Sequence, residues 1–272
     1  MNRQRPAPAR ADSAARPVTG QAALRRRSRC FIKLLCIVLV FIVASSTAVA
    51  AAVAGHDVDS SPSYPPLARL SPAEAQEAFK KLGALQRGVE SVSAHIVQTK
   101  RNPLLAGGTA SAGVLILKKP DLLRITISTP EQVTTIVDGT YMWVYRPLKK
   151  EAERHRLSND YAAAQAIKFL ANIMEFSIPE IEKRFSVSVY GAKGGYLFEM
   201  TPISGIMAKF LARVTFAFRE GSAVPDRFEV VGREGASTVT ELKDVVINPA
   251  PDKGAFLFTP ARDVRIIDLQ DE

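Results

Sequence analysis

The sequence predicts a mainly β protein whose long antiparallel sheet curves around an apolar interior. Four apolar runs follow one another between residues 109 and 147, separated by two prolines and by Asp138-Gly139. Prolines interrupt helices, and Asp-Gly between apolar runs is a strong hairpin signal. Two of the runs, 114–117 and 122–127, are largely apolar on both faces, whereas a sheet with one face in water alternates apolar and polar residues. Apolar material is therefore expected against each face of this meander.

The first 54 residues have the layout of a secretory signal peptide. An arginine cluster precedes residues 34–44, which carry no charge, and small residues follow up to Ala54. We expect cleavage after Ala50 or Ala54, and hence a periplasmic mature protein. The alternative is a retained membrane anchor, because the uncharged stretch is about as long as a bilayer-spanning helix.

The net charge of +9 arises almost wholly in this segment, which holds nine of the 36 basic residues and one of the 27 acidic ones. From residue 55 onward, the chain has 27 basic and 26 acidic residues, a net charge of +1. A nucleic-acid-binding protein needs its basic excess on the folded part, so no nucleic-acid partner is expected. Cys30 and Cys36, the two cysteines, also lie in the segment. The mature chain is therefore expected to have no disulfide, thiolate metal site or cysteine nucleophile.

A polar, proline-rich stretch predicts a flexible linker over residues 55–70, followed by a folded domain over residues 71–272. Ser71, Pro72 and Glu74 have the arrangement of a helix N-terminus with a capping box. The predicted helix continues to about Val89. Apolar residues recur along it at spacings of three and four: Phe79, Leu82, Leu85 and Val89.

Strands are expected on both sides of a helical interruption. Residues 94–100 precede the meander, 111–118 contain its first run, and 149–156 (KKEAERHR) form a charged strand or exposed edge. Helical spacing over 160–174 and 178–185 then interrupts the strands and predicts a cover for one opening of the sheet. Five further strands are predicted between residues 186 and 247. The total of about eleven strands requires a sheet that curls or closes.

The chain resembles the outer-membrane lipoprotein carrier (LolA) family in the order and spacing of several short motifs. These are the run 117–124 (LKKPDLLR), Pro130, the run 137–139 (VDG), Trp143-Val144-Tyr145 with Pro147, and the late 256–260 (FLFTP). The resemblance covers roughly residues 71–265. It implies an open, incomplete antiparallel β-barrel of about eleven strands with an N-terminal helix and a helical lid. It also implies a lipid-binding, non-enzymatic carrier that needs no cofactor.

The resemblance further implies partners and one positioning residue. The cargo would be the acyl chains of lipoproteins or another lipid, received from an inner-membrane donor complex and passed to an outer-membrane acceptor by a monomer. Lys119 stands where the family has an arginine that latches the lid. A lysine offers a point charge instead of a planar fork, so its latch would lack bidentate hydrogen bonds.

Strand periodicity gives candidate lipid-binding residues independently of the family. Alternate residues of a strand share a face. Leu115 and Leu117 share one face of their strand, and Trp143 lies on the aromatic face of a later one. The alternative for each is an ordinary filled core. The full candidate wall comprises Leu115, Leu117, Leu123, Ile125, Ile127 and Trp143.

Two other classes of function remain as alternatives to the carrier. A periplasmic sensor or adaptor with the same fold would be favoured by a retained anchor or a further interaction domain. An enzyme acting on lipids would need a nucleophile elbow or a metal cluster, and the sequence has neither motif. The three histidines, His56, His95 and His155, have no metal-ligand spacing. We therefore expect no catalytic residues and no metal.

Overall fold

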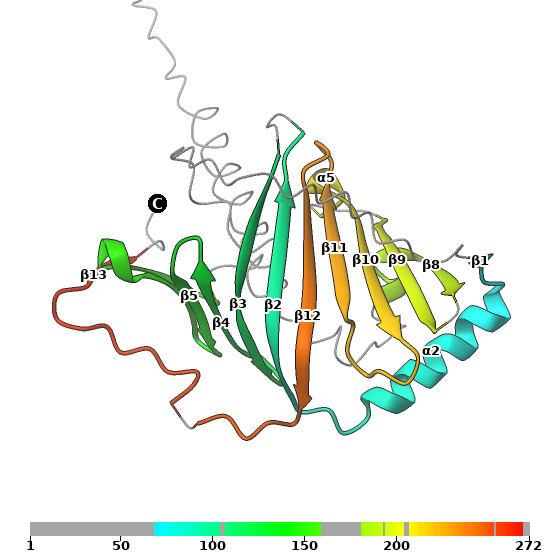
Figure 1. Ribbon diagram of the computed structural model, residues 1–272, viewed down its shortest axis with the longest axis horizontal. Coiled ribbons are helices and arrows are strands. Elements are labelled where there is room, and N and C mark those ends of the chain that lie inside the picture. The colour runs from blue at the N-terminus through cyan, green and yellow to red at the C-terminus, as the bar shows by residue number, and fades with distance from the viewer. Residues whose placement is uncertain are drawn as a thin grey trace, which may run out of the picture.

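A single sheet of 13 strands, open at both ends and antiparallel except for the pairing of β13 with β7, dominates the computed structural model (Figure 1). The structure describes residues 68–103, 107–158, 181–192, 194–203, 207–252 and 254–268. The strand order is β1-β8-β9-β10-β11-β12-β2-β3-β4-β5-β6-β7-β13. The strands are β1 (Ala68–Arg69), β2 (Ser91–Arg101), β3 (Gly108–Lys118), β4 (Leu122–Thr129), β5 (Val133–Asp138), β6 (Tyr141–Arg146), β7 (Glu151–Arg156), β8 (Phe185–Ala192), β9 (Gly195–Pro202), β10 (Leu211–Arg219), β11 (Arg227–Gly232), β12 (Ser237–Ile247) and β13 (Arg265–Asp268). The mainly β, open fold predicted from the sequence is confirmed.

The helix predicted to begin at Ser71 is α2 (Pro72–Gln86). The Ser71 side chain accepts a hydrogen bond from the Glu74 amide, and the Glu74 carboxylate accepts one from the Ser71 amide at 2.8 Å. This reciprocal capping box satisfies two amide groups that the first helical turn leaves unpaired. The side of α2 that bears Phe79 and Leu82 is buried against the sheet. Two short helices complete the described elements, η1 (Pro147–Lys149) and α5 (Met207–Phe210).

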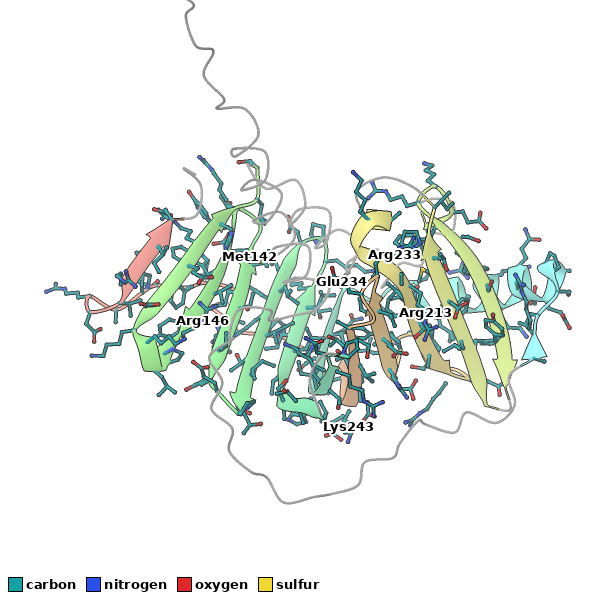
Figure 2. All side chains as sticks on the ribbon, turned by 90° about the horizontal axis from the view of Figure 1, so that it is seen from above. Met142, Arg146, Arg213, Arg233, Glu234 and Lys243 are labelled. Carbon is teal, nitrogen blue, oxygen red and sulfur yellow. The ribbon has the colours of Figure 1, made fainter. Side chains whose placement is uncertain are left out.

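The predicted meander is also present, with β2 to β7 pairing in chain order. Its Asp138-Gly139 turn has Gly139 at a φ of 88°, a conformation that favours glycine. The Asp138 carboxylate accepts hydrogen bonds from the amides of Thr140 and Tyr141 at 2.8 and 2.7 Å. Pairing of β12 with β2 then joins the meander to the later strands in one sheet. Figure 2 shows the row of strands from above, with Met142 on β6 in one half and Arg213 on β10 in the other.

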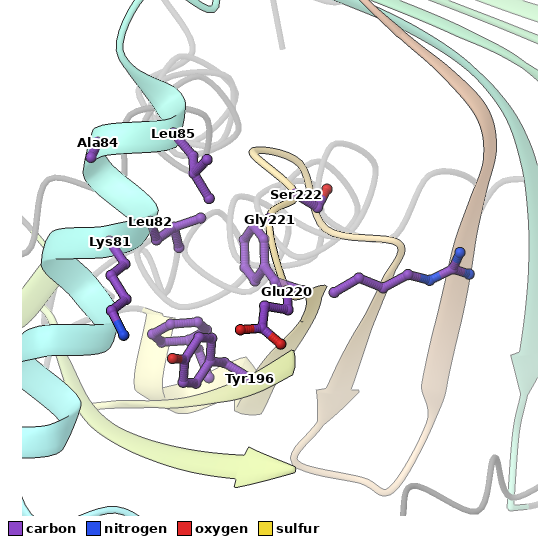
Figure 3. Close-up of a pocket in the computed structure, with 11 residues that line it drawn as sticks. Lys81, Leu82, Ala84, Leu85, Tyr196, Glu220, Gly221 and Ser222 are labelled. Atoms are coloured by element: carbon purple, nitrogen blue, oxygen red, sulfur yellow. The ribbon is translucent and has the colours of Figure 1, made fainter. Parts of the chain in front are cut away.

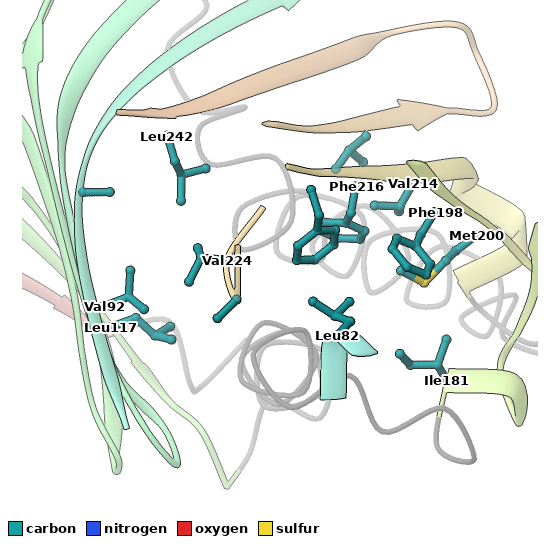
Figure 4. Packing of buried hydrophobic residues seen from close by; sticks show 14 of the residues in the cluster. Leu82, Val92, Leu117, Ile181, Phe198, Met200, Val214, Phe216, Val224 and Leu242 are labelled. Carbon is teal, nitrogen blue, oxygen red and sulfur yellow. The ribbon is translucent and has the colours of Figure 1, made fainter. Parts of the chain in front are cut away.

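The sheet curves around a large apolar cluster on its concave side. In Figure 4 the strands pass on three sides of this cluster, and Leu82 of α2 enters it from below. Phe198 of β9 lies 5.1 Å from Phe79 of α2 between ring centroids, and it is fully buried. A second, smaller cluster joins Ile136, Trp143 and Ala152 to Phe258 and Val264 of the C-terminal segment.

Two strands exceed the predicted number of about eleven. Strand β1 pairs with β8, so the described domain begins at residue 68, inside the predicted linker. Strand β13 pairs in parallel with β7. Of the two alternatives for residues 149–156, a charged strand or an exposed edge, the structure shows the strand: Glu151–Arg156 form β7, which is paired on both sides. Its charges pair with β13, where the Arg154 guanidinium binds both Asp268 carboxylate oxygens at 2.6 and 2.7 Å. A bidentate pair of this kind fixes the register of a short strand.

Several predicted segments lie outside the described residues: the signal peptide at 1–54, the linker up to residue 67, and residues 160–180 of the helical cover. From the cover, residues 181 and 182 are helical, and Ile181 is buried in the concave cluster. Phe185, predicted as the last residue of the cover, begins β8.

Gly113 allows an irregular step in the pairing of β3 with β4, and this generates a stability prediction. The register shifts between Ala112 and Gly113, and a Cβ added to Gly113 would lie 2.2 Å from the Thr126 carbonyl oxygen. Gly113→Ala should therefore lower the free energy of unfolding by about 1–3 kcal/mol. Gly83→Ala in α2 is the matched control, because a Cβ there meets nothing within 4 Å. It should raise the free energy of unfolding by about 0.5–1 kcal/mol. Denaturant unfolding measures both, and equal stability of Gly113→Ala and the wild type would contradict the prediction.

Candidate functional site

The concave face of β2, β3 and β4 presents three successive apolar rows. Residues that face each other across antiparallel strands point to the same side of the sheet. The first row contains Leu123, Leu117 and Val92, the second Ile125, Leu115 and Ala94, and the third Ile127, Gly113, Ile96 and Leu242. The structure thus brings together five of the six predicted wall residues: Leu115, Leu117, Leu123, Ile125 and Ile127. All five belong to the concave cluster or pack against it.

Trp143, the sixth predicted residue, lies on the other face of the sheet. Met142 faces Val137, which faces Leu123, so Met142 belongs to the concave face and its neighbour Trp143 does not. The Trp143 ring packs against Phe258 with 5.2 Å between centroids. The C-terminal segment therefore covers the aromatic face of β6, and Trp143 stands apart from the other five residues.

Lys119 follows β3 at the end of the sheet where α2 leads into β2. Its amide donates a hydrogen bond to the Glu90 carbonyl at 2.9 Å, and its side chain is partly buried. Residues 160–180, most of the cover it was predicted to latch, lie outside the described residues. The latch therefore remains a prediction.

A cavity of about 390 Å³ opens between α2 and the ends of β9 and β10 (Figure 3). Its volume is within the range of small-molecule sites. The wall is mostly apolar, with Lys81 extending from α2 and Glu220 from the turn after β10. The sequence placed Leu82 and Leu85 on the apolar side of the predicted helix but did not predict this cavity, because its other wall comes from residues more than 100 positions away. The lining residues are Lys81, Leu82, Ala84, Leu85, Tyr196, Phe198, Phe218, Arg219, Glu220, Gly221 and Ser222.

Beyond the apolar rows, the concave face of β3, β2 and β12 becomes polar. Gln98 faces Ser111 on one side and Thr240 on the other, and Lys100 in the next row faces Thr238. The Gln98 amide nitrogen donates to the Thr240 hydroxyl at 3.1 Å. Burial lowers the pKa of Lys100 to about 8. The sequence contains a signal for this patch. On the face formed by every second residue of β2, apolar side chains at 92, 94 and 96 are followed by polar ones at 98 and 100.

Nothing in the described residues suggests a metal site or a membrane-spanning helix. Within them, no group of three or more histidine, cysteine, aspartate or glutamate side chains is placed to hold a metal ion. No helix among them has the length and apolar character needed to cross a bilayer. His95, which faces solvent, lies 3.0 Å from an Asp244 carboxylate oxygen.

Fold and site together define a β-sheet protein with an apolar concave face and a helix packed inside its curve. The chain belongs to the LolA family, because the family model described as outer membrane lipoprotein carrier protein LolA matches residues 87–259. An outer-membrane lipoprotein carrier protein of Xylella fastidiosa (strain 9a5c) is 25% identical over 188 residues, which cover 68% of this chain and 85% of the relative. One of Yersinia pestis bv. Antiqua (strain Angola) is 27% identical over 158 residues, covering 57% and 71%. Among solved structures, a LolA superfamily protein from Nitrosomonas europaea matches with a TM-score of 0.39 and 14% identity, covering 68% of this chain and 97% of that one.

The lowered pKa of Lys100 predicts a pH dependence of stability. Its pKa is about 8 in the folded protein against an ordinary value of 10.5, so between these values the unfolded chain binds more protons. The contribution of Lys100 to the free energy of unfolding should therefore become more favourable as the pH rises from 8 to 10.5. Lys100→Met should raise the free energy of unfolding at about pH 7 and diminish its increase between about pH 7 and pH 9.5. Denaturant unfolding at both pH values measures this, with exposed Lys118→Met as the control that keeps the wild-type increase. An unchanged increase in Lys100→Met would contradict the prediction.

Proposed function

We propose that the protein carries the acyl chains of a lipoprotein, or of another lipid, on the concave face of its sheet and transfers them towards the outer membrane. The main support is the set of three contiguous apolar rows on β2, β3 and β4. The cavity at α2 adds to it, because Leu82, Phe198 and Phe218 belong both to the cavity lining and to the concave cluster. Membership of the LolA family supports the proposal, because that family is named for lipoprotein carriage.

The energetics of acyl chains suit such a role. Burying one methylene contributes about 0.8 kcal/mol, and micromolar affinity corresponds to about 8 kcal/mol. Part of one long chain therefore supplies the affinity even after losses of rotational and translational freedom. A carrier must also release its cargo, so the face is expected to shelter the chains only in part.

The remaining features of the proposal follow from the sequence. The segment 1–54 directs the chain to the periplasm and is removed there. The mature protein acts as a monomer between an inner-membrane donor complex and an outer-membrane acceptor. Residues 160–184, which precede β8, act as a movable cover that Lys119 helps to hold in place. No catalytic step or cofactor is part of this function.

Leu115 offers the sharpest test of the binding face. Ile125 and Ile127 are only 5% and 2% exposed, so a charge there threatens folding, whereas Leu115 is partly buried. Leu115→Glu should weaken uptake of a fluorescent fatty acid by about tenfold or more, because a carboxylate resists desolvation beside an acyl chain. Val114→Glu is the matched control, since Val114 is 36% exposed on the opposite face of the same strand. Circular dichroism verifies folding. Equal uptake by the two folded variants would remove this strand from the binding face.

The latch proposal is tested with two neighbouring lysines. Lys119→Leu should change uptake or release of an acylated cargo in a transfer assay between membranes, because the leucine lacks a charge to hold the cover. Lys118→Leu serves as the control, as Lys118 is exposed at the end of the same strand. If both uptake and release match the wild type in Lys119→Leu, Lys119 is not a latch.

A further inference from the structure

The polar end of the concave face contains a buried acceptor with a fixed orientation. Gln98 is 4% exposed, and Thr240 and Thr238 of the neighbouring strand are buried as well. The Gln98 amide nitrogen donates its hydrogen bond to the Thr240 hydroxyl, which orients the carbonyl oxygen of the same side chain. That oxygen is buried and has no hydrogen-bond partner among the described residues. Burying an acceptor without a hydrogen bond lowers the stability of the fold. The Gln98 carbonyl oxygen is therefore a position where the hydrogen-bond donor of a ligand would be favoured.

The position of Gln98 relative to the apolar rows defines what kind of donor fits. Gln98 follows Ile96 by two residues on β2 and therefore stands in the row directly beyond the third apolar row. An amphiphile lying along the strands with its tail on the apolar rows would place its first polar group at Gln98. Along β2 the concave face thus changes from apolar to polar, and an acyl ligand changes in the same way from its tail to its head group.

We propose that Gln98, Thr240 and Lys100 form a subsite for the amide that joins an acyl chain to an amine. The Gln98 carbonyl oxygen accepts the N–H of the ligand amide, and Lys100 donates to its carbonyl oxygen. The inference rests on the proposed function and adds a selectivity to it. An ester or a carboxylate presents oxygen acceptors to Gln98 and no donor, so it matches the subsite less well. The partial burial that lowers the pKa of Lys100 to about 8 agrees with a shielded position beside this group.

The wild-type protein tests the selectivity without any mutation. Methyl palmitate and N-methylpalmitamide have the same tail and differ in one N–H donor, and each is titrated against a bound fluorescent fatty acid. N-methylpalmitamide should displace the fluorescent probe at a concentration about three- to tenfold lower, as one net hydrogen bond predicts. Equal displacement by the two ligands would overturn the subsite and leave the carrier proposal standing. If the fluorescent probe itself fails to bind, the carrier proposal fails.

Three variants assign the selectivity to Gln98. Gln98→Met keeps the length of the side chain and removes the acceptor, so it should lose the preference for the amide while keeping its affinity for methyl palmitate. Thr240→Val removes the hydroxyl that orients Gln98 and should reduce the preference. Thr99→Val, next to Gln98 on the opposite face, should retain it. Persistence of the full preference in folded Gln98→Met would refute the role of this residue, and should that variant not fold, Thr240→Val decides in the same way.

A third ligand distinguishes the two sources of an acyl amide, an acylated protein and a small amide lipid. A short N-palmitoyl peptide carries the same amide followed by a peptide chain. Tighter binding of this peptide than of N-methylpalmitamide indicates an N-acylated protein as the natural ligand, and equal binding indicates a small amide lipid. Both results support an amide subsite, whereas binding of the peptide no tighter than methyl palmitate speaks against it.

Discussion

The pairing of β12 with β2 is the interaction on which the rest of the structure depends. It joins the meander formed by β2 to β7 with the later strands, and its register sets Leu242 opposite Ile96 and Thr240 opposite Gln98. Because the side chains of a strand alternate between faces, a slip by one residue would turn one half of the interior outward. The register therefore gives both halves of the chain a common concave face. The meeting of Leu242 with Ile96 in the third apolar row, and the polar patch around Gln98, follow from it.

Helix α2 fills part of this concave side and leaves a cavity at its edge. Its capping box fixes where it begins, and Phe79 packs against Phe198 inside the curve of the sheet. The turn after β10 closes the opposite wall, where the Ala223 carbonyl accepts a hydrogen bond from the Gln86 side chain at 2.9 Å. A rigid helix and an open sheet thus enclose an interior that a fully closed and filled barrel would not offer.

Local chemistry made much of this fold predictable. The capping box at Ser71 and Glu74 and the turn at Asp138-Gly139 depend on neighbouring residues, so their sequence patterns were sufficient. The apolar face shared by Leu115 and Leu117 was likewise evident from alternation. Strands β1 and β13 escaped prediction because they are short and pair with segments far away in the sequence.

Trp143 shows the limit of that reasoning. Alternation separates Trp143 from Met142 but does not say which of the two faces the interior, and both faces of β6 are apolar. The choice is made by Phe258, more than 100 residues later, which covers the aromatic face. Gln98 lies inside the predicted strand 94–100, but its position as a buried acceptor could not be predicted, since it depends on Thr240 of a distant strand.

Native mass spectrometry of the mature protein, purified from the periplasm without detergent, tests the central claim most directly. The account predicts a population of chains that carries one acylated ligand, and release of that ligand when the protein unfolds. Two results together would contradict the claim that the concave face binds acyl chains. The purified chain would be free of acylated ligand, and its mass would stay unchanged after incubation with an acylated peptide.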